Sequence, residues 1–181
     1  MSNRLRPEGL KPEGFRFDDP LPAIIYWDTS FVDAFLMGGP SSPYLECKRF
    51  GDRLMSEGVI PVVSDFVYNE VAFIMIKRAL VMEGRRLGLS WLAVKERYPD
   101  FIKGVMPEVH STRAELDDLT LKLGIGDAVT SSAFELMERS GLLPTDAYHI
   151  AVSLDSEVAS FVTLDKDFLH VDGIEVYTCL P

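Results

Sequence analysis

The chain has 181 residues, 47% of them hydrophobic, and a formal net charge of −10 at pH 7. This length and apolar content predict one compact domain with a sizeable core. No apolar run approaches the roughly 18 residues of a membrane span, and no secretion signal precedes the first strand, so we expect a cytoplasmic protein without a membrane partner. Cys47 and Cys179 have no companions at zinc-ligand spacing and are expected to be reduced thiols.

The first 22 residues are predicted to form a proline-rich, extended N-terminal arm. Four prolines fix φ and remove backbone donors there, which disfavours both a helix and a central strand. Phe15 and Phe17 are the side chains expected to hold the arm against the body. The remaining residues, 23–181, are then a single domain.

Beyond the arm, apolar strands alternate with segments of helical periodicity. The expected strands span 23–27, 59–63, 159–163 and 174–178. A short helix is expected to begin near residue 31. Further helices are expected to span 44–56, 64–82, 90–98, 111–122, 128–140 and 144–155. The first strand is apolar throughout, as in a parallel sheet covered by helices on both faces, whereas Pro61 is unusual inside the second strand. The order of elements predicts a three-layer α/β fold with a largely parallel sheet.

Four acidic residues lie where such a sheet would bring them together. Asp28 follows the first strand directly, and Asp165 follows the third strand after one residue. Glu70 and Asp146 lie in the second and first turns of helices that start from the same edge. Ligands of open α/β sheets bind at the carboxyl ends of the strands. We therefore expect the four carboxylates to surround one small volume.

Clustered carboxylates favour a divalent cation. Mg²⁺ takes oxygen ligands and keeps several waters, and without a cation the mutual repulsion would raise the pKa values of the acids. Taken singly, each acid also has a structural interpretation. Asp146 can complement a helix dipole, and Asp165 or Asp167 can cap the segment that begins at Lys166. Only their combination predicts a metal site.

The local strings around the acids resemble those of the PIN-domain family. They are Ile-Ile-Tyr-Trp-Asp-Thr-Ser from residue 24, Asn-Glu-Val from 69, Thr-Asp-Ala-Tyr-His-Ile-Ala from 145 and Phe-Val-Thr-Leu-Asp-Lys-Asp-Phe from 161. The resemblance implies a Rossmann-like α/β/α sandwich and a hydrolase that cuts RNA phosphodiester bonds with Mg²⁺ or Mn²⁺. Many relatives are toxins held by an antitoxin, so an antitoxin and a second copy of the chain, in a homodimer, are expected partners besides RNA. The chain departs from the compact toxin pattern in two ways. The stretch between Glu70 and Asp146 is long, and an N-terminal arm precedes the first strand.

The resemblance also assigns roles by position. The acids that match the family's catalytic, metal-binding residues are Asp28, Glu70, Asp146 and Asp165, with Asp167 as a further metal ligand. The hydroxyl-bearing neighbours, which would orient a carboxylate or touch phosphate, are Thr29, Ser30 and Thr163. Either two metals clamp the scissile phosphate or one metal works with a carboxylate base, and Asp28 would be the central ligand.

Two further features have both a functional and a structural interpretation. His149 shares a helical face with Asp146 and either contacts substrate or is a packed residue that supports the site. Residues 77–103 carry seven basic and three acidic side chains within an acidic protein. This stretch, with Arg85 and Arg86 near its middle, is expected to track an RNA backbone, although solvated helix faces explain it as well.

Other classes of protein fit less well. A phosphatase of the haloacid-dehalogenase type needs a second Asp where Ser30 stands, and a receiver-like phosphoacceptor domain does not use the string from residue 145. A catalytically silent PIN-like scaffold and a DNA-directed nuclease remain alternatives, because metal chemistry does not read the 2′-hydroxyl.

Overall fold

The computed structural model describes residues 13–39 and 41–180, so most of the predicted arm lies outside the described residues. The strands are β1 (Glu13–Phe15), β2 (Ile24–Trp27), β3 (Ile60–Val63), β4 (Leu121–Lys122), β5 (Ser160–Val162) and β6 (Glu175–Tyr177). The helices are α1 (Thr29–Met37), α2 (Ser42–Ser56), α3 (Asp65–Leu87), α4 (Trp91–Arg97), α5 (Phe101–Leu119), α6 (Val129–Ser140), α7 (Pro144–Asp155) and the 3₁₀ helix η1 (Lys166–His170).

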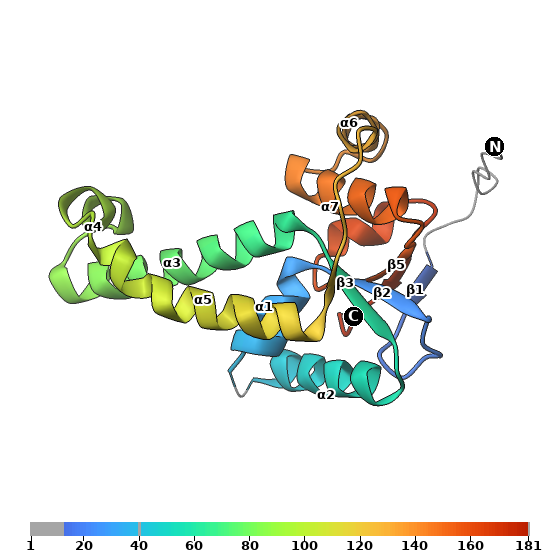
Figure 1. The fold of residues 1–181 in the computed structure, drawn as a ribbon, viewed down its shortest axis with the longest axis horizontal. Helices are drawn as coiled ribbons and strands as arrows, with labels where there is room; N and C mark the ends of the chain where they lie inside the picture. The colour runs from blue at the N-terminus through green and yellow to red at the C-terminus, as the bar shows by residue number, and fades with distance from the viewer. Residues whose placement is uncertain (1–12, 40, 181) are drawn as a thin grey trace.

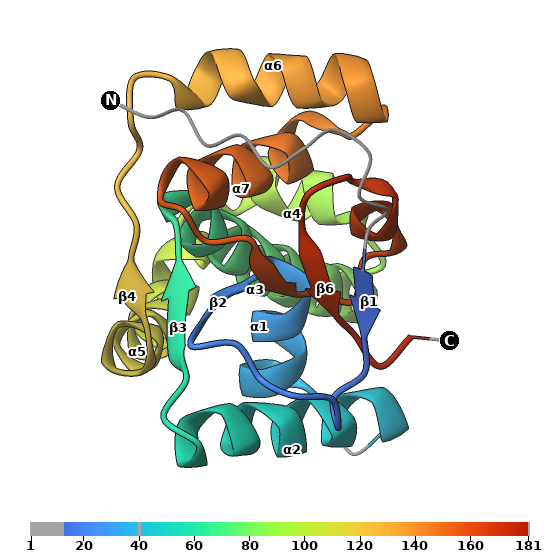
Figure 2. The same ribbon diagram turned by 90° about the vertical axis from the view of Figure 1, so that its right-hand side faces the viewer.

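The six strands form one parallel sheet in the order β1-β6-β5-β2-β3-β4. Helices α6 and α7 cover one side of the sheet and α1 and α2 the other, while α3, α4 and α5 extend away from it (Figure 1; Figure 2 shows the sheet from another side). The predicted layered α/β fold with a parallel sheet is therefore confirmed. The chain leaves β2 toward β3 on one side and returns to β5 on the other. Ligands of parallel sheets bind at such a switch point.

Packing between distant segments explains where the helices differ from the prediction. Helix α5 begins at Phe101, ten residues earlier than expected, and continues through Pro107 because Val109 and Leu116 are buried. Helix α3 runs past residue 82 to Leu87 and ends at Gly88, whose φ of 68° is the left-handed conformation that glycine adopts readily.

Two edge strands were not predicted. β1 lies within the stretch assigned to the arm and pairs with β6, where Phe15 stacks on Tyr177 at 4.9 Å between ring centroids. Phe17 stacks on Phe50 at 4.0 Å, so both phenylalanines hold this segment against the body. β4 is only two residues long and pairs with β3. Short edge strands have too few residues to show an alternating pattern.

Pro61 fits inside β3 because the neighbouring edge strand, β4, is short. The amide of Ile60 donates to Ala23 on the β2 side, so the missing amide of Pro61 faces the β4 side. β4 begins opposite Val62, and no ladder bond is lost at the proline. Both cysteines are free thiols, and none of the described helices is long and apolar enough to cross a membrane.

Candidate metal centre

Asp28 stands at the carboxyl end of β2 and caps the N-terminus of α1. It is only 5% exposed. Its Oδ2 atom accepts hydrogen bonds from the hydroxyls of Ser30 at 2.6 Å and Thr163 at 2.8 Å, and from the Ser30 amide at 3.2 Å. Such hydrogen bonds offset the free-energy cost of burying a polar side chain. The other oxygen, Oδ1, has no hydrogen-bond donor among the described residues.

Glu70 reaches the same volume from the second turn of α3. Its Oε2 atom accepts from the Thr29 hydroxyl at 2.6 Å and lies 2.8 Å from Nε2 of His149. Burial raises the pKa of Glu70, whereas the hydrogen bonds from His149 and Thr29 lower it. Together the hydrogen bonds outweigh burial, so the net pKa of Glu70 lies below its ordinary value. Glu70 is therefore a carboxylate with one oxygen held by two donors.

His149 is fully buried and links three elements. Nε2 lies beside Glu70 and 4.0 Å from Oδ1 of Asp28, and Nδ1 lies 2.8 Å from the hydroxyl of Tyr26. That hydroxyl is 2.6 Å from Oγ of Ser64, which precedes α3. Ser64 occupies the predicted N-cap position, yet its side chain makes no capping bond. Its hydroxyl is hydrogen-bonded to Tyr26 instead.

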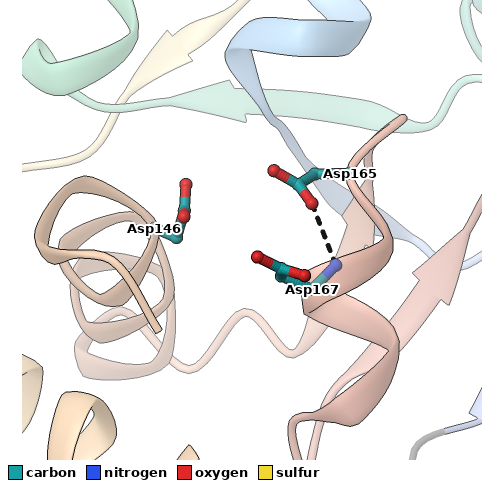
Figure 3. A group of neighbouring side chains, drawn as sticks. All are labelled: Asp146, Asp165 and Asp167. Carbon is teal, nitrogen blue, oxygen red and sulfur yellow. Dashed lines mark hydrogen bonds between the residues drawn. The ribbon is translucent and has the colours of Figure 1, made fainter. Parts of the chain in front are cut away.

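Asp146, Asp165 and Asp167 form the open end of the cluster. One carboxylate oxygen from each lies within 4.8 Å of the others, and Figure 3 shows Asp146 on its helix facing the two aspartates across the gap. Asp165 caps η1, with Oδ1 accepting from the Asp167 amide at 2.9 Å. Burial and the charges of Asp165, Asp28 and Glu70 raise the pKa of Asp146 to about 6, although His149 opposes the shift. This repulsion is what a cation between the carboxylates would relieve.

Comparison with known proteins identifies the family. The sequence profile of the PIN domain matches residues 25–174. The chain belongs to the PIN-domain family. Among curated proteins, none matches the sequence.

Two solved structures share the fold of this PIN domain. One is VapC20 of Mycobacterium tuberculosis, described as a sarcin-ricin loop cleaving toxin, with a TM-score of 0.51 and 16% identity over 80% of this chain and 92% of that chain. The other is FitAcB of Neisseria gonorrhoeae, with a TM-score of 0.50 and 16% identity over 85% of this chain and 96% of that chain. At this identity the likeness concerns the fold.

The PIN domain brings the predicted acids and hydroxyls together but leaves the predicted basic residues apart. Arg85 lies fifteen residues along α3 from Glu70, which is about 22 Å at the helical rise. Arg86 is paired with Glu83 at 2.5 Å, Arg78 with Asp33 at 2.6 Å, and Lys103 with Asp100 at 2.6 Å. No described carboxylate pairs with Lys77 or Arg85.

Sequence reasoning missed Tyr26 as part of the site. A tyrosine in an otherwise apolar buried strand, two residues before Asp28, shares a strand face with that acid. A buried tyrosine hydroxyl needs a partner. The position of Tyr26 on this face and its need for a partner could have indicated that it belongs to the site. Its partner, His149, lies 123 positions away and could not be identified from the local sequence.

The donor set of the PIN domain fits a hard divalent cation. Every candidate ligand atom at the open end is a carboxylate oxygen, and no described thiol lies there. Mg²⁺ and Mn²⁺ prefer such oxygens. Asp146, Asp165 and Asp167 would hold the ion, and Oδ1 of Asp28 and Oε1 of Glu70 are carboxylate oxygens without a hydrogen-bond donor among the described residues.

We expect Asp146→Asn to stabilise the metal-free protein at pH 8 by about 1 kcal/mol, after allowing for solvent screening of this half-buried group. The folded-state pKa of about 6 lies above the ordinary 3.8. Ionisation therefore destabilises the fold progressively as the pH rises between these values, and the gain from Asn should vanish near pH 4. Urea unfolding of both proteins in EDTA at pH 4 and pH 8 measures this difference in the free energy of unfolding.

Asp118→Asn, at an exposed position of α5, is the matched control and should change the free energy of unfolding by less than about 0.5 kcal/mol. An equal effect of Asp146→Asn at pH 4 and pH 8 would contradict the proposed repulsion.

Proposed function

We propose that this PIN domain is a divalent-metal-dependent ribonuclease that hydrolyses phosphodiester bonds in RNA. The observation that carries the proposal is the convergence of Asp28, Glu70, Asp146 and Asp165 from four different elements onto one edge of the sheet. PIN domains are generally metal-dependent nucleases, which agrees with this arrangement. A silent scaffold would not need a buried carboxylate, Asp28, and a partly exposed one, Glu70, each held in place by dedicated donors.

The bound cation, Mg²⁺ or Mn²⁺, would lower the pKa of a water and stabilise charge on the phosphate. The protein's own contribution is to place the ligands. Ser30 and Thr163 orient Asp28, and Thr29 and His149 orient Glu70. Asp167 is exposed and follows Asp165 by two residues, where it can complete the open side of the site.

The experiment that tests the function is a cleavage assay on mixed RNA and on single-stranded DNA with Mg²⁺, Mn²⁺ or EDTA. We expect RNA fragments with either cation and none with EDTA. Cleavage of DNA alone would support the DNA-directed alternative. RNA cleavage that persists in EDTA would sink the metal-dependent mechanism.

The face of α3 that continues from Glu70 is the proposed path of the RNA strand. Lys77 lies two turns beyond Glu70 on the same side of the helix, with Phe73 between them and Arg85 further along. Phe73 is 53% exposed and the two cations have no described carboxylate partner. Exposed aromatic and basic side chains in a row bind single strands by stacking and by phosphate contacts. Arg86 is a weaker candidate because Glu83 neutralises it.

We expect Lys77→Ala with Arg85→Ala to raise the KM for RNA about tenfold and to reduce the salt dependence of binding by about 1.4 in log–log slope, with kcat little changed. The reason is that two phosphate contacts are lost away from the scissile bond. Steady-state kinetics at several salt concentrations measure both effects. Arg113→Ala with Arg139→Ala removes equal charge from α5 and α6, and an equal change in that control would refute the path.

An antitoxin protein is a proposed partner, and a homodimer is the proposed assembly. The support for an antitoxin is that VapC20, which shares the fold, is described as a toxin. Induced expression should then arrest growth, and Asp28→Asn should relieve the arrest. Normal growth with the active enzyme would favour a ribonuclease outside toxin–antitoxin systems. Size-exclusion chromatography with light scattering tests the dimer.

A further inference from the structure

We propose that His149 is a positioning residue that fixes Glu70 as a single-oxygen metal ligand and thereby makes the site prefer Mg²⁺ over Ca²⁺. The proposal rests on the proposed function in assuming that a divalent cation binds among the acids. It extends that function by assigning the selectivity to a buried side chain that is not itself a ligand.

The first observation is that only one carboxylate oxygen of Glu70 is hydrogen-bonded to described residues of the protein. Thr29 and His149 both bond Oε2, at 2.6 and 2.8 Å. No described residue is hydrogen-bonded to Oε1. A carboxylate accepts but does not donate, so Nε2 of His149 carries a proton toward Glu70. With Oε2 occupied in this way, Oε1 is the oxygen left for a cation.

The second observation is that the same pattern recurs in the neighbouring acids. Oδ2 of Asp28 accepts three hydrogen bonds from Ser30 and Thr163, and Oδ1 accepts none from the described residues. Oδ1 of Asp165 accepts from the Asp167 amide. Three carboxylates thus each have one oxygen committed to the protein. A site built from single carboxylate oxygens leaves room for waters, as Mg²⁺ requires, whereas Ca²⁺ commonly takes both oxygens of a carboxylate.

The third observation is the set of contacts that holds His149 in place. The ring is fully buried, and its Nδ1 is held by the Tyr26 hydroxyl, which Ser64 holds in turn at 2.6 Å. The three residues come from α7, β2 and the end of β3, so three elements define the position of Nε2. Phe66 packs edge-on against the ring at 6.1 Å between centroids. Such supporting contacts are known to set metal affinity from outside the ligand shell.

Loss of the histidine should therefore change the choice of metal and not only its affinity. In His149→Leu, only Thr29 would hold Oε2, and Glu70 would be free to turn both oxygens toward a cation. Ca²⁺ benefits from a second oxygen and Mg²⁺ does not. His149→Gln places an amide donor close to the position of Nε2 and should restore the native preference. Tyr26→Phe keeps the ring but removes the hydroxyl that holds Nδ1.

The test measures cation binding without RNA, by competition of Mg²⁺ and Ca²⁺ against Mn²⁺ followed by the paramagnetic resonance of free Mn²⁺. We expect His149→Leu to weaken Mg²⁺ about tenfold and Ca²⁺ less than about twofold. Tyr26→Phe should lower the Mg²⁺/Ca²⁺ preference about threefold, and His149→Gln should stay within about twofold of the native chain. Ile150→Val, at the next buried position of α7, is the control for a core change without a polar contact.

An unchanged Mg²⁺/Ca²⁺ preference in His149→Leu would overturn the inference. Should that variant fail to fold, an unchanged preference in Tyr26→Phe overturns it equally. A native chain that binds no divalent cation overturns both this inference and the metal-dependent function. A native chain that binds Mg²⁺, responds as expected to the variants and yet leaves RNA intact overturns the ribonuclease alone.

Discussion

Replacing Asp28 by Asn is expected to reduce RNA cleavage by at least about 100-fold, the scale on which loss of one electrostatic group acts at a reacting centre. Three donors from Ser30 and Thr163 meet Oδ2 of Asp28. The amide of Asn must either turn its oxygen to these donors, which leaves its NH₂ group facing the cation, or turn its NH₂ group to them and lose the bonds. Neither orientation preserves the anionic ligand.

The measurement is single-turnover cleavage of an RNA substrate at saturating Mg²⁺, together with thermal unfolding in EDTA. Asn has nearly the shape of Asp, so the variant should fold and its melting temperature should not fall by more than a few degrees. Asp52→Asn removes a charge from an exposed position of α2 and should cleave at the native rate. Cleavage by Asp28→Asn at more than about a tenth of the native rate would remove Asp28 from the role of central ligand.

Replacing Thr163 by Val is expected to slow cleavage about 10- to 100-fold and to destabilise the fold by about 1 to 3 kcal/mol. The Thr163 hydroxyl donates to Asp28 at 2.8 Å and accepts from the Asp165 amide at 2.9 Å. It therefore couples the ligand at the end of β2 to the ligand beyond β5. Val keeps the shape but leaves the amide without this acceptor.

The matched control for Thr163→Val is Thr178→Val, which lies just beyond the neighbouring strand β6. The Thr178 hydroxyl is also buried and accepts one backbone bond, from Leu180 at 3.2 Å, but it is hydrogen-bonded to no carboxylate in the described part of the chain. We expect the control to lose some stability and to keep its cleavage rate once folded. Equal slowing in both variants would indicate general loosening of the sheet edge.

The sequence was most informative where a local pattern coincides with a structural element. The apolar run before Asp28 and the proline before Asp146 located β2 and α7 to within a residue, because strand burial and helix initiation are set by adjacent side chains. Edge strands and the early start of α5 were not predicted. They depend on the neighbour against which the segment packs, and that neighbour is distant in the chain.

The site divides in the same way. The sequence by itself determined that four acids stand at the carboxyl edge of a parallel sheet, because strand ends and first helical turns are local features. Only the tertiary structure decided which oxygen of each acid is held by the protein, through contacts such as that between His149 and Glu70, 79 positions apart. It also decided which cations of the basic stretch have a carboxylate partner, since Arg78 pairs with Asp33 across 45 positions. Hydrogen bonds and ion pairs depend on distances in space, which have no periodic signature along the chain.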